Sequence, residues 1–355
     1  MRASSILGGI DLSKLENDVM EVVFAVLAGF AISGLLMATG GFDPIKAYVS
    51  LFKSAIGDLY GVSTTLSYAT PLMLTGLAFA VSVRAGVFNI GAEGQVYMAA
   101  LGAVIAASLT LPAGLYLVAE FFLGVSLAIM WSSLAGILKS QRGVNEVVST
   151  IMLNWIGFWI VEYARTYVYF DPTEPQRTIK IPEQGRLPVL VPGTELYAGV
   201  IISLIITVAV YAVMWHTAIG YEIRATGLNP TAARYGGVKI KKSLLYSFII
   251  SGSLAGLAGV MEVAGRPPHY AITTGLSNLV GLGFDGLAVS LIARNHPLAI
   301  IPAAIFVGAL VAGSRGMQIE SGVPLEMVKA VQGIIIIILA VPGLVRMLRE
   351  WREKK

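Results

Sequence analysis

Long apolar runs recur from one end of this chain to the other, and they limit its possible folds more than any other feature. A helix needs about 20 mostly apolar residues to cross the hydrocarbon core of a bilayer. Charged residues make up only 13% of the 355 residues, whereas soluble domains usually carry roughly 25%. We therefore predict an all-α, polytopic integral membrane protein with about ten transmembrane helices. The candidate spans are residues 19–41, 61–83, 91–110, 113–137, 147–164, 196–215, 243–264, 279–293, 298–314 and 321–345.

Basic residues are unevenly distributed between the two sides that these spans define. With the N-terminus placed inside, the inside segments carry roughly twice as many Lys and Arg residues as the outside segments, as the positive-inside rule requires. We therefore expect both termini to be cytoplasmic and residues 1–355 to form a single transmembrane domain. Three runs are short and rich in glycine, so we expect broken or re-entrant helices at 91–110, 279–293 and 298–314.

Two segments between the spans are long enough to have a structure of their own. Residues 165–195, on the predicted outer side, hold five prolines and form either an ordered, extended cap or a plain connector. Residues 216–242, on the inner side, include a short helix at about 229–235. Asn229 suits its N-cap and Pro230 its first position, and two glycines follow it. This helix either packs on its own bundle or docks with a cytoplasmic partner.

Polar residues at membrane depth are costly and often mark a solute pathway. Asn, Glu and Gln lie among glycines in the run VFNIGAEGQ at 87–95, and an Asn-Trp pair lies within the span 147–164. The functional interpretation is a broken helix beside a translocation pathway. The alternative is a tight turn whose polar groups cap two helices, with the aromatic residues serving only in packing. The candidate pathway residues are Phe88, Asn89, Glu93, Gln95, Asn154, Trp155, Phe284 and Asp285.

The sequence lacks the patterns of several enzyme classes. It has no Gly-Lys dipeptide, and the phosphate-binding loop of ATPases requires one. It has no cysteine, its three histidines are scattered without metal-ligand spacing, and no GxSxG nucleophile motif occurs. The net charge of +4 is too small to indicate nucleic-acid binding. We expect a conduit with no catalytic residues, bound metal or bound cofactor.

Four stretches resemble the membrane-spanning permease subunits of ABC importers in the branched-chain amino acid, ribose and nucleoside group. GVFNIGAEGQ at 86–95 and GVNEVVSTIMLN at 143–154 are similar to motifs of the nucleoside or simple-sugar branch. The stretch at 220–265, which begins GYEIRATGLNPTAARYGG, resembles the cytoplasmic loop and following span of the whole group. GFDGLAVSLIARNHPL at 283–298 favours the guanosine-type permeases over the ribose permeases.

The resemblance implies a multi-pass permease in the cell membrane, either inner or plasma membrane, that imports nucleosides by alternating access. It implies a second permease chain, often a related but different one, and an extracytoplasmic substrate-binding lipoprotein. Two cytoplasmic ATP-binding subunits would use the ATP, and the helix at 229–235 would couple them to this chain. The residues implied in this coupling are Gly227, Asn229, Pro230, Ala232, Ala233 and Gly237.

Two alternatives remain open at the level of the sequence. The first is an ABC permease of the same fold that carries ribose or another simple sugar. The second is an ion-coupled secondary transporter that acts alone and uses Glu93, Glu120 and Asp285 as a charge relay. The inner docking helix argues against the second, because a carrier that acts alone does not require one. Neither the particular nucleoside nor the choice between homodimer and heterodimer follows from the sequence.

Overall fold

The computed structural model describes residues 12–340, with side chains from residue 23 onward. Packing divides the chain into two compact units. The larger is Phe52–Gly313, and the smaller combines Met1–Leu51 with Ser314–Lys355. Both termini and the last five residues of the predicted span 321–345 lie outside the described residues.

The smaller unit is built on the pairing of α1 (Leu12–Thr39) with α13 (Leu325–Ala340). Gly29 of α1 lies against the backbone of Ile335, and small residues at such crossings let membrane helices approach closely. The first part of α2 (Pro44–Ile56) belongs to this unit. Tyr48 of α2 attaches it to α1, because its hydroxyl donates a hydrogen bond to the Phe30 carbonyl at 2.6 Å.

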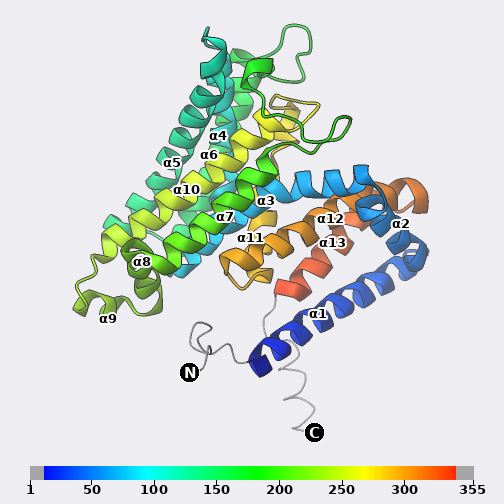
Figure 1. Cartoon of the computed structure of the whole chain (residues 1–355), viewed down its shortest axis with the longest axis horizontal. Helices are drawn as coiled ribbons and strands as arrows, with labels where there is room; N and C mark the ends of the chain where they lie inside the picture. The colour runs from blue at the N-terminus through cyan, green and yellow to red at the C-terminus, as the bar shows by residue number, and fades with distance from the viewer. Residues whose placement is uncertain (1–11, 341–355) are drawn as a thin grey trace, which may run out of the picture. The chain divides into compact units, whose positions relative to one another are not determined.

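The larger unit is a helical bundle whose centre is α4 packed against α5 and α10 (Figure 1). Small residues line these contacts, as is usual for helices that associate in membranes. Gly124 of α5 lies against α4 and Val260 of α10, and Gly259 of α10 lies against Val96. The helices are α3 (Leu59–Arg84), α4 (Ala92–Ala107), α5 (Tyr116–Arg142), α6 (Glu146–Tyr163), α7 (Gly199–His216), α10 (Ile240–Gly265), α11 (Leu282–Ile292) and most of α12 (Pro297–Ser321).

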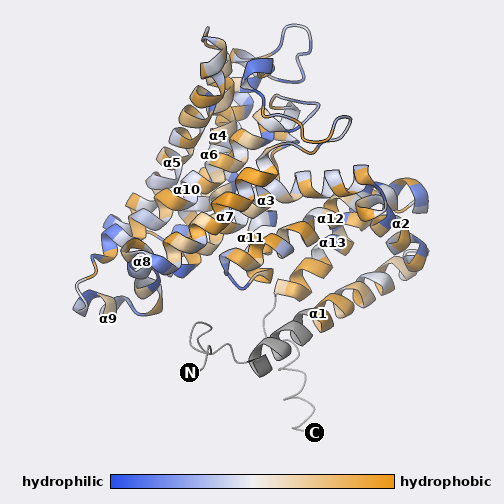
Figure 2. Cartoon of the chain, viewed as in Figure 1, coloured by the Kyte–Doolittle hydropathy of each residue, from blue (hydrophilic) through white to orange (hydrophobic). Residues whose placement is uncertain are grey.

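The two ends of this bundle differ in structure. Figure 1 places α8 (Ala218–Leu228) and α9 (Pro230–Tyr235) at one end and the long loop 169–198 at the other. Figure 2 shows hydrophilic colour concentrated at these two ends and apolar helix between them. Among the described residues, six helices are long and apolar enough to cross a membrane: α3, α5, α6 (continued to Val168), α7, α10 and α12. The all-α membrane fold predicted from composition is therefore confirmed for the described residues.

Each of the ten predicted runs contains a helix, and α4 and α11 are short, as expected. The prediction of a short or broken helix at 298–314 is wrong. α12 is one continuous helix of 25 residues, because it continues beyond the apolar run into the more polar sequence that ends at Ser321. None of the predicted runs covers α2, whose 13 residues are too few to span a bilayer.

The long loop 169–198 is ordered, and its role as an outer cap stays a prediction. Three isolated β-bridges form in it, one of them between Arg177 and Thr273 in the segment that precedes α11. The amide of Thr178 donates to the Ile272 carbonyl at 2.9 Å. The loop is therefore attached to the segment 266–281, which leads from α10 into α11 and includes a short 3₁₀ helix at Thr274–Leu276.

Candidate functional site

Two short helices, α4 and α11, begin inside the larger bundle and meet there by their N-terminal ends. Thr75 of α3 donates a hydrogen bond to the Leu282 carbonyl at 2.9 Å, so α11 begins beside Thr75. Since a helix rises 1.5 Å per residue, Thr75 lies about 14 Å before the end of α3 at Arg84. A side chain at Gly283 would collide with the backbone of Glu93, which places the first turns of α4 and α11 in direct contact.

Glu93, in the first turn of α4, holds this junction together. Its Oε1 accepts a hydrogen bond from the Gly281 amide at 2.5 Å, and its Oε2 accepts one from the Gly283 amide at 2.6 Å. The Tyr97 hydroxyl donates a third bond to Oε1 at 2.6 Å. The amides at the start of a helix lack partners within the helix and favour a negative charge nearby. The Glu93 carboxylate therefore caps α11 from a neighbouring helix.

Asn154, in the middle of α6, connects that helix to the start of α4. Its Oδ1 accepts a hydrogen bond from the Gly94 amide at 2.9 Å, and its Nδ2 donates to the Ile90 carbonyl at 3.0 Å. A Cβ at Gly94 would lie 2.9 Å from the Cα of Asn154, so the two backbones touch. The Asn154 side chain thus gives the Gly94 amide, in the first turn of α4, the acceptor that the helix itself does not provide.

Asn89 orders the non-helical residues between α3 and α4. Its Oδ1 accepts from the Gly91 amide, and its Nδ2 donates to Ser251 Oγ of α10, both at 2.9 Å. Gln95 is also buried, and its Oε1 has no hydrogen-bond partner among the described residues. The hydrogen bonds of Asn89, Asn154 and Glu93 are those of the capping alternative. These three side chains build the frame of the junction, and their contact with a solute stays a prediction.

The other candidate residues are accessible. Phe88 is 41% exposed, Phe284 50% and Trp155 60%. Phe88 packs edge-on against Phe79 with ring centroids 4.9 Å apart, and Phe284 lies in the first turn of α11, beside the half-buried Asp285. Aromatic faces beside amides and a carboxylate suit a ligand that combines a flat ring with polar groups. The structure therefore separates a buried polar frame from exposed aromatic side chains around it.

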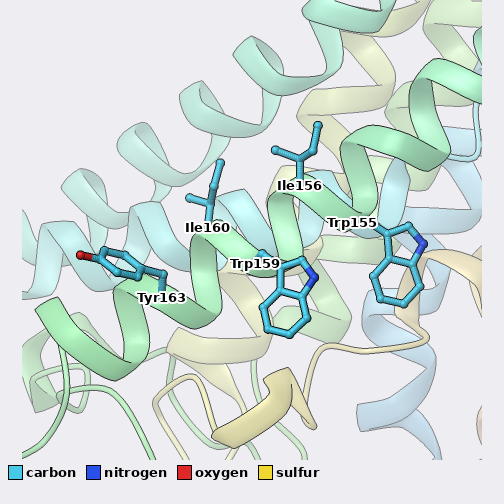
Figure 3. A pocket seen from close by; sticks show the side chains of 5 residues that line it. All are labelled: Trp155, Ile156, Trp159, Ile160 and Tyr163. Atoms are coloured by element: carbon cyan, nitrogen blue, oxygen red, sulfur yellow. The ribbon is translucent and has the colours of Figure 1, made fainter.

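Trp155 also belongs to a second surface. It lies with Trp159 in an open, apolar hollow on α6, and Figure 3 shows the two tryptophans one turn apart on the same side of the helix. Ile156, Ile160 and Tyr163 complete the lining. An apolar, exposed helix face of this kind suits acyl chains or another apolar helix in the bilayer.

Several residues of the junction were not predicted from the sequence. Tyr97 follows Glu93 by four residues, the spacing at which helical side chains meet, so this pair was predictable. Thr75, Ser251 and Gly281 lie far from Glu93 in the chain and come from three other segments. Nothing in the local pattern of the sequence distinguishes them.

The short helix α9 forms as predicted, at the end of the bundle that lies away from the loop 169–198 (Figure 1). Asn229 Oδ1 accepts from the Ala232 amide at 3.0 Å, and Gly237 ends the helix with a positive φ of 87°. Gly227 packs so closely on the turn after α3 that a side chain there would collide with the Arg84 carbonyl. Leu228 and Tyr235 are 88% and 90% exposed. Exposed large apolar side chains beside a firmly attached helix are typical of an interaction surface.

Comparison with known proteins identifies the family. The branched-chain amino acid transport system / permease component family matches residues 61–340. The guanosine ABC transporter permease protein NupP of Bacillus subtilis is 34% identical over 96% of this chain and 99% of its own length. The nucleoside ABC transporter permease protein NupB of Lactococcus lactis is 33% identical, covering 95% and 94%.

The glucose ABC transporter permease protein TsgB13 of Haloferax volcanii is 29% identical over 89% of this chain and 86% of its own length. The similarity to all three relatives thus includes both the α4–α11 junction and the α8–α9 end. The chain belongs to the permease components of branched-chain amino acid-type transport systems.

Proposed function

We propose that this chain is the membrane-spanning permease subunit of an ABC importer that takes up nucleosides. The observation that carries the proposal is the similarity, over nearly the whole of both chains, to the guanosine and nucleoside permeases NupP and NupB. The exposed aromatic rings of Phe88 and Phe284 around a polar junction are consistent with a ligand that contains a flat base.

We propose ten membrane spans with both termini in the cytoplasm of a cell whose inner or plasma membrane holds the protein. The bias of basic residues supports this orientation. It puts the α8–α9 end inside and the loop 169–198 outside. In this arrangement the start of α4 and the start of α11 lie at membrane depth, where non-helical backbone is tolerated if it lines a cavity or is buried in protein.

The ATP-binding subunit would dock on α9 from the cytoplasm, and ATP would be bound and hydrolysed there rather than on this chain. Gly227, the Asn229 cap and Gly237 set the position of α9, while Pro230, Ala232 and Ala233 form its body. Because Gly227 contacts the turn between α3 and α4, a displacement of α9 would reach the α4–α11 junction through that turn. A second permease chain and an extracytoplasmic binding lipoprotein complete the proposed importer.

A sugar importer of the same fold is the second candidate. The glucose permease TsgB13 supports it, at a lower identity of 29%. An ion-coupled carrier that acts alone has less support, since the relatives with the highest identity are ABC permeases and Glu93 is occupied in capping α11.

Uptake by cells with and without this gene tests the proposal. Labelled guanosine, adenosine, uridine, ribose and leucine would be supplied at low concentration, with ATP depletion in parallel. We expect loss of ATP-dependent nucleoside uptake alone in cells without the gene. Loss of ribose or glucose uptake with nucleoside uptake intact would favour the sugar importer. Uptake that survives ATP depletion but collapses with the ion gradient would overturn the ABC mechanism.

A further inference from the structure

A cluster of cationic and aromatic side chains lies at the α8–α9 end of the bundle, apart from the α4–α11 junction. Trp215, in the last turn of α7, has the guanidinium of Arg84 5.4 Å from its ring centroid and that of Arg224 at 5.2 Å. Tyr211 stacks on the same tryptophan at 5.4 Å, and the His296 ring lies 5.1 Å away. Four segments of the chain thus converge on one ring.

The positive charge of this cluster has no counterpart among the described side chains. Neither Arg84 nor Arg224 forms an ion pair with a carboxylate of residues 23–340. Arg84 donates to the Asn295 carbonyl at 3.1 Å, whereas the buried Nε of Arg224 has no hydrogen-bond partner within the same residues. Burial lowers the pKa of His296, and the charge of Arg84 lowers this pKa further.

Two other partly buried arginines in the same bundle are neutralised by carboxylates. Arg165 pairs with Glu162 at 2.7 Å, and Arg266 pairs with Glu195 at 2.8 Å. Arg84 and Arg224, which share one tryptophan ring, have no such carboxylate partner among the described residues. Two cations that contact one ring without a neutralising group repel each other, and a bound anion that contacts both would reduce that repulsion.

The surroundings of the cluster indicate where such an anion would come from. The exposed face of α7 that leads to Trp215 is apolar and includes Ile205 and Val208, and Ile219 of α8 is also exposed. In a bilayer this face meets acyl chains, which places the arginines at the end of α3 and in α8 at the level of the lipid headgroups.

We propose that Arg84, Arg224 and Trp215 form a binding site for a phosphate anion, supplied by the headgroup of an acidic phospholipid. The planar fork of a guanidinium matches two oxygens of a phosphate, and the indole supports both arginines from the side. The site does not depend on which solute the chain carries. It requires only that the α8–α9 end lies at a membrane surface.

Occupation of the site would fasten α8 to α3. Arg224 lies three residues before Gly227, and Arg84 lies two residues before Gly86, against which Gly227 packs. An anion held by both arginines therefore adds a second attachment beside the Gly86–Gly227 contact. We expect the bound phospholipid to increase the resistance of the chain to unfolding.

The test uses the purified full-length chain in neutral detergent, freed of native lipid. Native mass spectrometry and thermal unfolding would be measured with phosphatidylglycerol, phosphatidylcholine, inorganic phosphate and guanosine monophosphate added separately. We expect phosphatidylglycerol to bind at least about tenfold more tightly than phosphatidylcholine and to raise the Tm. We expect this preference to be lost in Arg224→Gln and kept in Arg142→Gln, which removes an exposed arginine at the same end of the bundle.

Stabilisation by inorganic phosphate or guanosine monophosphate that depends on Arg224, without a lipid preference, would overturn the lipid as the source. An equal loss in Arg142→Gln, or no preference in the unaltered chain, would overturn the site itself.

Arg224→Lys keeps the charge and serves as the control for folding. If Arg224→Lys elutes as the unaltered chain does but binds no phosphatidylglycerol, the guanidinium is required, as the proposal states. If Arg224→Gln keeps the full preference, the proposal fails.

Discussion

Glu93 Oε2 accepts a hydrogen bond from the backbone amide of Gly283 at 2.6 Å, so a carboxylate in the first turn of α4 caps the first turn of α11. The positive ends of two helix dipoles therefore meet at one negative charge. The two residues are 190 positions apart in the sequence. This hydrogen bond therefore joins two distant segments of the chain within the bundle. A transporter that must open and close needs such a junction to be stable in at least one of its states.

Replacement of Glu93 by alanine should lower the thermal stability of the purified chain and abolish uptake. Hydrogen bonds to a charged group contribute about 1.5–3 kcal/mol each, and three bonds to Glu93 would be lost. Glu93→Gln should be intermediate, because its oxygen can still accept a bond while its NH2 group faces donors. Differential scanning fluorimetry and uptake would measure both effects. Glu326→Ala, at an exposed carboxyl in α13, is the control, and an unchanged Tm in Glu93→Ala would contradict the capping role.

We expect the chain to lose stability when Asn154 is replaced by either a larger apolar residue or a carboxylate. Its side chain accepts from Gly94 and donates to Ile90, so aspartate keeps the acceptor but points its second oxygen at a carbonyl. Leaving a buried polar group without a partner costs about 1–3 kcal/mol. We expect Asn154→Asp and Asn154→Leu to lower the Tm by comparable amounts. If Asn154→Asp is as stable as the unaltered chain, the hydrogen bond that Asn154 donates to the Ile90 carbonyl does not contribute to stability.

Gly227→Ala should separate transport from ATP hydrolysis while leaving the chain inserted and folded. A methyl group at this position would collide with the carbonyl of Arg84, so α8 must move away from the turn that leads to α4. Gly236→Ala is the matched control, because its nearest atom would be the Ala233 oxygen at 3.4 Å. The measurement is nucleoside uptake per ATP hydrolysed in membranes that contain the complete importer. Equal ratios in the two variants would argue against the α3–α8 contact as the route of coupling.

The sequence predicted the positions of the helices better than it predicted which residues contact one another in the folded chain. Apolar runs located the spans, and the Asn229–Pro230 pair located α9 to the residue, because both signals are local. The length of α12 was underestimated, since a helix can continue into polar sequence when its other end is anchored in the bundle. Asn89 and Asn154 were identified as candidates from their polarity at membrane depth. Their roles depend on Ser251 and Gly94, which packing brings close, and no spacing rule connects them.

Arg266 should be needed to hold the loop 169–198 and the end of α10 together. It pairs with Glu195 of the loop at 2.8 Å and with the buried Glu262 at 3.2 Å, and it lies 3.7 Å from the ring centroid of Tyr68. Removing one partner of a buried ion pair costs about 3–5 kcal/mol because the other charge is left uncompensated. Arg266→Gln should therefore speed proteolytic cleavage within the loop.

The double variant Arg266→Gln with Glu262→Gln tests the cause of that effect. If the uncompensated carboxylate is responsible, neutralising Glu262 should restore much of the resistance to cleavage. If the double variant is cleaved as fast as Arg266→Gln alone, the loss of the Glu195 and Tyr68 contacts explains the effect instead.

Phe284→Ala should weaken nucleoside transport through the binding of the base. The ring is half exposed in the first turn of α11, beside Asp285, and stacking of a base on an aromatic side chain contributes about 1–3 kcal/mol. We expect an increase in KM of roughly 5- to 150-fold for nucleosides, with little change in the Tm, since few packing contacts are lost at an exposed position. Phe284→Tyr should keep the stacking and the affinity.

Trp159→Leu, on the apolar face of α6, is the control for loss of an exposed aromatic residue and should leave KM unchanged. A Phe284→Ala variant with the KM of the unaltered chain would remove Phe284 from the pathway, and an equal effect of Trp159→Leu would assign the change to membrane packing.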